Sequence, residues 1–185
     1  MNILKALLAD LRRLLTRLLT VVRRPMSAVF VPNPRRTLVM LSYWAHAHRG
    51  LWDYDQARPV RYGLRPRFKK DCSGGIAWLY WCAGLNDPTR NAFSGGDTYT
   101  GSLLYHGQRI QASQVRAGDV CVFGAELPTE MQHAMMALQR GPNPLSFSHG
   151  RQGDPSLIRP SVDSRSKTWL RFDLRRVRRI QWPGV

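Results

Sequence analysis

Two kinds of residue in this sequence could together carry out nucleophilic chemistry. Cys72 stands in the stretch Asp71-Cys72-Ser73-Gly74, ahead of an apolar segment of helical length that runs to Gly84. Asp71 is a good N-cap residue, and backbone N–H groups and the helix dipole at a helix start favour an anion. The pattern predicts a thiolate nucleophile with a lowered pKa. A small cysteine buried in a core helix is the alternative reading.

A thiol nucleophile needs a base beside it, and the base needs an orienting partner. His133 opens a predicted strand, and His149 ends a neighbouring one. A turn at 141–144 would make these strands antiparallel neighbours and bring both histidines to the same edge. We therefore expect Cys72 to be the nucleophile, His133 the base, and His149 the residue that holds the other ring nitrogen of His133. The remaining histidines lie among apolar residues and are expected to be packing or surface residues: His46, His48 and His106.

The elements that would position these residues come as helices first and strands afterwards. A helix is predicted over 37–48, a loop over 49–70, the cysteine helix next, and a short helix over 102–106. The turn Ala117-Gly118-Asp119 leads into the sheet. Strands are predicted over 120–123, 133–138, 145–149 and 168–172. This order favours an α+β domain with an antiparallel sheet over alternating βαβ units.

Size and charge limit the classes of function. The chain has 185 residues, 43% of them hydrophobic, and a net charge of +16. Such a surface attracts polyanions: nucleic acid, anionic lipid or an anionic wall polymer. Basic residues are densest at the two ends, with eight Lys or Arg in 1–36 and eight in 159–185. No recognition motif accompanies the arginines of the basic tail over 176–185, so nucleic-acid binding is disfavoured.

Residues 3–24 carry leucines at a spacing of three and four, with arginines on the other face. The pattern predicts a cationic amphipathic helix over 1–24, followed by a Pro-rich linker over 25–36. Arginines interrupt every window, so neither a transmembrane span nor a signal peptide is expected. The helix could pack on the domain or on a partner such as a virion protein, self-associate, or lie on an anionic membrane surface.

Three cysteines, with no CxxC pair, make neither a disulfide framework nor a zinc site. Cys72 and Cys82, on one helix, would stand roughly 15 Å apart, too far to bridge. We expect no metal and no cofactor.

Three motifs in this order resemble the NlpC-type cell-wall cysteine peptidases. They are Asp71-Cys72-Ser73-Gly74, then Ala117-Gly118-Asp119 at a strand entry, then His133 at the next strand start. The stretches 83–88, 99–104 and Ser148-His149-Gly150 are similar in particular to versions in phage lysins and virion-associated proteins that act on actinobacteria. The resemblance covers about 37–172.

The resemblance implies a papain-like fold over 37–175 and a peptidoglycan hydrolase that cleaves peptide bonds of stem peptides at the host cell envelope. By position, Cys72 resembles the nucleophile, His133 the base and His149 the third polar residue. Tyr62 matches a tyrosine that lines the family's site, and Asp71 and Ser73 are expected beside the substrate. This chain continues from Tyr62 with Gly63-Leu64-Arg65-Pro66, where the family has tryptophan and paired glycines.

Two other roles stay open from the sequence. The domain could be a catalytically inactive, peptidase-like binding or structural module, attached through residues 3–24. Within the enzyme class, the cleaved bond could be a peptide, a cross-bridge or a muramyl amide.

Overall fold

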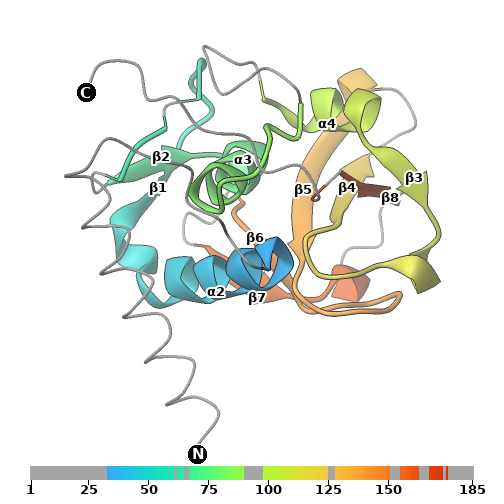
Figure 1. Cartoon of the computed structure of the whole chain (residues 1–185). Helices are drawn as coiled ribbons and strands as arrows, with labels where there is room; N and C mark the ends of the chain where they lie inside the picture. The colour runs from blue at the N-terminus through green and yellow to red at the C-terminus, as the bar shows by residue number, and fades with distance from the viewer. Residues whose placement is uncertain are drawn as a thin grey trace, which may run out of the picture.

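A computed structural model describes residues 33–60, 62–64, 67–89, 98–124, 128–150, 155–162, 167–172 and 174. The predicted amphipathic helix over 1–24, most of the linker over 25–36 and the basic tail over 176–185 lie outside these residues. Helices α2 and α3 lie against a curved sheet, and α4 lies at one end of it (Figure 1). None of the described helices combines the length and the apolar character that crossing a bilayer requires.

Within the described residues the main sheet has six strands, and all of its pairings are antiparallel, in the order β3-β8-β4-β5-β6-β7. Its strands are β3 (Gln108–Ile110), β4 (Val120–Gly124), β5 (Met131–Ala137), β6 (Ser146–Ser148), β7 (Ser156–Ile158) and β8 (Lys167–Arg171). The α+β prediction with an antiparallel sheet is therefore confirmed. The four predicted strands match β4, β5, β6 and β8 within a residue or two, whereas the short edge strands β3 and β7 were not predicted.

Helix α2 (Pro34–Ala47) starts three residues before its predicted start. The Asn33 side chain accepts a hydrogen bond from the Arg36 backbone N–H at 3.0 Å and caps the helix. Pro34 occupies the first helical position, where its missing N–H costs nothing. The last residues assigned to the linker therefore belong to α2.

The prediction of a loop over 49–70 is wrong in part. Strands β1 (Trp52–Tyr54) and β2 (Phe68–Lys70) pair in parallel, separately from the main sheet. Their inward side chains, Trp52 and Phe68, pack with tilted rings at 5.1 Å between ring centroids. Both rings also contact Trp78 of α3, so this small sheet covers one side of the cysteine helix.

Helix α3 (Cys72–Cys82) is the centre of the fold, and every residue from Cys72 to Trp81 is buried. It packs against β5 and lies between α2 and β2. A side chain at Gly75 would lie 3.4 Å from the Phe147 ring of β6, which shows how closely the helix approaches the sheet. The helix ends before Gly84, whose φ of 68° suits glycine after a helix.

A buried carboxylate forms ion pairs with arginines from both ends of the described domain. Asp119 is fully buried and lies 3.3 Å from Arg35 of α2 and 3.5 Å from Arg171 of β8. Arg35 also donates to the Ala117 carbonyl. The predicted turn at Ala117-Gly118-Asp119 is present, with Gly118 at a φ of 89°, a conformation that favours glycine.

Candidate active site

The first turn of α3 is held by a polar network beneath it. Asp71 caps the helix by accepting from the Gly74 backbone N–H at 2.7 Å and from the Ser73 hydroxyl at 3.2 Å. Arg58 donates to the other oxygen of Asp71 at 2.6 Å. The predicted helix start and its Asp71 cap are therefore present. Arg58 was not anticipated, because nothing in the sequence links it to a residue thirteen positions away.

Cys72 occupies the first position of α3 and is only 4% exposed. The Thr100 hydroxyl oxygen lies 3.5 Å from its sulfur. The backbone of Ala134, the residue after His133, also lies close enough to lower the pKa of the thiol. The sulfur thus lies between the start of α4 (Thr100–His106) and the start of β5.

The expected lowering of the Cys72 pKa is wrong, because its surroundings raise the pKa of this thiol. Burial is the largest cause, since it disfavours the charged form, and the Asp71 carboxylate adds to it. Hydrogen bonds from Thr100, Ala134 and Ser73 act in the opposite direction. Hydrogen-bond donors near the helix start lower the pKa of Cys72, but the effect of burial is larger. The raised pKa of Cys72 therefore favours the neutral thiol over the thiolate.

His133 is half-buried at the start of β5, and its Nε2 lies 2.9 Å from the Ser148 hydroxyl of β6. Its ring also contacts the Phe123 ring, at 5.9 Å between centroids. A side chain at Gly150 would lie 3.7 Å from the ring carbon Cε1 of His133. A residue next to His149 therefore holds a ring nitrogen of His133: it is Ser148, where His149 was predicted.

Strand pairing explains why Ser148 reaches His133. Met135 pairs directly with Ser148, and directly paired residues share a face of the sheet. Side chains alternate along a strand, so His133 lies on the face of Met135 and Ser148, and His149 on the opposite face. His149 is fully buried there, with its ring 5.6 Å from that of Trp52. The two histidines reach one end of the sheet, as predicted, but from opposite faces.

The structure places His149 under the first turn of α3. Its Cβ lies 3.7 Å from the position that a side chain at Gly75 would occupy. Its ring packs edge-on against Trp52 and Tyr54 of β1. His149 is thus positioned to support the helix that carries Cys72.

Comparison with known proteins gives the fold a name. The sequence matches no family model and no curated protein. The structure is similar to the NlpC/p60 domain of the peptidoglycan hydrolase SagA, with a TM-score of 0.51 and 15% identity over 75% of this chain and 98% of that one. It is also similar to the peptidoglycan hydrolase RipB of Mycobacterium tuberculosis, with a TM-score of 0.51 and 14% identity over 90% and 83% of the two chains.

The chain has the NlpC/p60 fold. A third similar structure is RipD of Mycobacterium tuberculosis, described as a non-catalytic NlpC/p60 domain protein adapted to peptidoglycan binding. Its TM-score is 0.50 and its identity 20%, over 75% of this chain and 97% of that one. The fold therefore occurs in both hydrolases and binding proteins, and at these identities the similarity establishes the fold alone.

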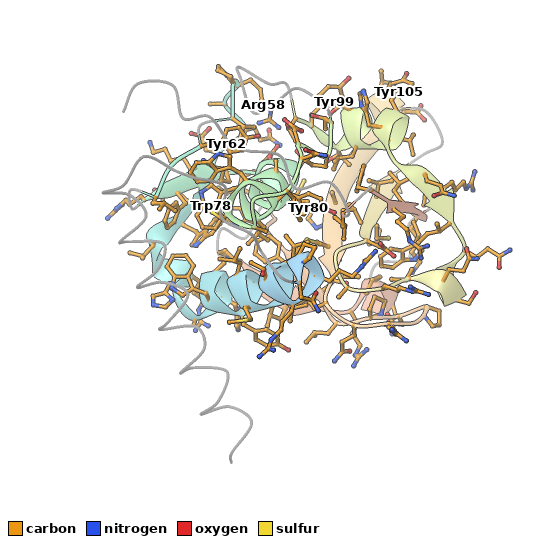
Figure 2. All side chains as sticks on the ribbon, viewed as in Figure 1. Arg58, Tyr62, Trp78, Tyr80, Tyr99 and Tyr105 are labelled. Carbon is orange, nitrogen blue, oxygen red and sulfur yellow. The ribbon has the colours of Figure 1, made fainter. Side chains whose placement is uncertain are left out.

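In this NlpC/p60 fold, the Tyr62 ring packs along α3, while its hydroxyl interacts with Thr98 beside the helix start. Its ring packs at 6.0 Å from that of Trp81, about two and a half turns from Cys72. The neighbouring Gly63 carbonyl accepts from the Trp78 indole at 2.8 Å. Figure 2 shows Tyr62 and Trp78 close together on this side of α3, with Arg58 above Tyr62. Burial raises the pKa of Tyr62 well above its ordinary value, so its phenol stays neutral.

Asp71 and Ser73, the other predicted substrate-binding residues, are 6% and 0% exposed. The Ser73 hydroxyl lies 3.2 Å from both Asp71 and the Thr98 carbonyl. Both side chains hold the start of α3 in place. Two residues beside the site were missed, Thr100 and Ser148. Ser148 could have been found from strand alternation had the register of the hairpin been known.

Proposed function

We propose that this protein is a peptidoglycan hydrolase, a cysteine endopeptidase acting on stem peptides of the bacterial cell wall. The observation that carries the proposal is the meeting of two elements. The sulfur of Cys72, at the start of α3, lies near enough to the backbone of Ala134 in β5 for that backbone to lower the pKa of the thiol. The adjacent residue, His133, has its Nε2 held by Ser148 at 2.9 Å. The similarity to SagA and RipB supports peptidoglycan as the substrate.

The proposed mechanism uses His133 as the base. Donation from Nε2–H to the Ser148 hydroxyl fixes the tautomer in which Nδ1 accepts the proton of the Cys72 thiol. The sulfur attacks the scissile carbonyl, and backbone N–H groups at the start of α3 stabilise the oxyanion. Protonated His133 gives its proton to the leaving amine, which leaves a thioester. Water then releases the peptide acid and restores the thiol.

A neutral resting thiol fits this scheme, because the proton is removed only when the substrate is attacked. In the proposal Ser148 takes the orienting role that was predicted for His149. His149 instead lies on the face of the sheet that packs against α3, under the first turn of that helix. Substrate contacts of Tyr62 are not part of the proposal, since its ring is packed against Trp81.

Digestion of purified peptidoglycan, with mass spectrometry of the released fragments, tests the proposal and identifies the bond. Wild type should release stem-peptide fragments with new amino ends. Cys72→Ser should release none, and His133→Ala should be slower by about 10²–10⁴-fold. Circular dichroism should show that both variants are folded. Full activity of Cys72→Ser would reject Cys72 as the nucleophile.

A catalytically inactive binding domain is the second candidate. RipD provides a non-catalytic example of the fold. Such a protein would sediment with insoluble peptidoglycan without releasing fragments, and Cys72→Ser would bind as well as wild type. Fragment release that depends on Cys72 would eliminate this candidate.

We further propose that the protein comes from a phage and acts at the cell wall of its host. The resemblance of 99–104 and of Ser148-His149-Gly150 to phage lysins supports a phage protein that acts on the host wall. The basic ends of the chain, with eight Lys or Arg each, would add attraction to anionic wall polymers. Release of fragments from actinobacterial walls in preference to other walls would support this source.

A further inference from the structure

We propose that Thr100 is a positioning residue for the nucleophile: its hydroxyl holds the Cys72 sulfur at the start of α3 and donates a hydrogen bond to the thiolate when it forms. The inference rests on the proposed role of Cys72 and adds a residue to it. The supporting contact is the 3.5 Å separation between the Thr100 hydroxyl oxygen and the Cys72 sulfur.

The backbone around Thr100 is anchored to α3 independently of this contact. Ser73, the residue after Cys72, donates to the Thr98 carbonyl at 3.2 Å. Two consecutive residues of α3, Cys72 and Ser73, therefore contact the residues on either side of Tyr99. Tyr99 itself is 45% exposed and points outward on α4, as does Tyr105 (Figure 2).

The start of α4 is also fixed internally. The Tyr99 backbone N–H donates to the Ser102 hydroxyl at 3.1 Å, and that hydroxyl lies 2.8 Å from the Tyr99 carbonyl. Such capping removes freedom from the first helical turn. Thr100 is thus presented to the sulfur by a rigid element, and it is only 6% exposed. A donor held in place in this way loses little entropy when the thiolate forms.

The Thr100 hydroxyl is not needed to fill the space beside Cys72, but it can donate a hydrogen bond to the sulfur. Valine has the shape of threonine and would fill the same buried space without a polar group. A buried thiolate is costly unless donors face it. Among the described residues, Thr100 is the only side chain whose hydrogen bond opposes the raised pKa of Cys72, the other such donors being backbone groups.

The test is the pH dependence of alkylation at Cys72 in the full chain, with iodoacetamide as the probe and peptide mapping to isolate Cys72 from the other cysteines. Thr100→Val should move the alkylation curve to higher pH and slow the reaction at pH 8 by about tenfold. Thr100→Ser keeps the hydroxyl and should follow wild type closely. Thermal unfolding of each variant monitors the fold.

Superimposable curves for Thr100→Val and wild type would overturn the proposal. Equal shifts in the valine and serine variants would also overturn it, because the methyl and not the hydroxyl would then matter. If Thr100→Val fails to fold, Thr100→Ala combined with Thr100→Ser makes the same comparison. The alkylation readout needs no peptidoglycan, so a failure of the proposed hydrolase activity would not be confused with a failure of this inference.

Discussion

At the scale of single residues, the position of Cys72 at a helix start could be predicted from the sequence, but the surroundings of its sulfur could not. Cys72 was recognised by its place after a good N-cap, and the structure puts it there. The sign of its pKa shift was wrong, because burial depends on what packs over the helix. The choice between Ser148 and His149 depends on which face of β6 each side chain takes, and neighbouring residues always take opposite faces.

Ser148 therefore gives the sharpest residue-scale prediction. Ser148→Ala removes the acceptor for His133 Nε2, so the imidazole loses its fixed tautomer and its charged form loses a partner. We expect kcat on a soluble stem-peptide substrate to fall by about tenfold with little change in KM.

Ser148→Thr is the matched control, since it retains the hydroxyl and should recover most of the rate. An unchanged kcat in Ser148→Ala would show that the 2.9 Å contact has no part in catalysis. A fall in both variants that parallels a loss of thermal stability would show a purely structural role.

At the scale of elements, strongly patterned segments were predictable and short ones were not. The apolar run after Cys72 and the strands β4, β5, β6 and β8 of the main sheet were predicted, although β6 has only three residues. Strands β1, β2, β3 and β7 have three residues each, too few for an alternating pattern to stand out. Their positions follow from contacts such as Trp52 with Phe68, which link distant parts of the chain.

The junction between α4 and β8 can be tested at Gly107, which ends α4. A side chain there would come within 2.7 Å of the Leu170 Cβ, a contact that requires one of the two elements to shift. We expect Gly107→Ala to lower the free energy of unfolding by about 1–3 kcal/mol, measured by urea denaturation. The shift should also slow Cys72 alkylation, since α4 carries Thr100.

Gly50→Ala is the control, because a side chain at Gly50 meets no atom within 4 Å. Its effect on stability should be within about 0.5 kcal/mol. Equal stability of the two variants would mean that the approach of Gly107 to Leu170 imposes no constraint on the fold.

At the scale of the whole molecule, the order of helices and strands was enough to predict the α+β class. Sheet order was not predictable, because β8 inserts between β3 and β4, and nothing local in the sequence specifies that pairing. Burying α3 completely has a further effect on the molecule: it places ionisable groups where their charged forms are disfavoured. Burial raises the pKa of Cys72 and, beyond its ordinary value of 10.0, that of Tyr80.

The sign of the resulting pH dependence follows from proton linkage. Above pH 9, the ordinary value for cysteine, the unfolded chain loses protons that the folded protein still holds. Stability should therefore be complete at pH 7.5 and fall as the pH rises through 9 to 10.5. Urea unfolding midpoints at these pH values would measure it. Cys72→Ser lacks the thiol and should give a flatter profile between pH 9 and 10, and identical slopes would contradict this account.

The buried carboxylate of Asp119 has a consequence for anyone who shortens this protein. Its two cationic partners lie near opposite ends of the described chain, at Arg35 and Arg171. Trimming from either terminus past one of these arginines would leave a negative charge inside the molecule with only half of its compensation. The smallest autonomous version of the domain must therefore extend from before Arg35 to beyond Arg171.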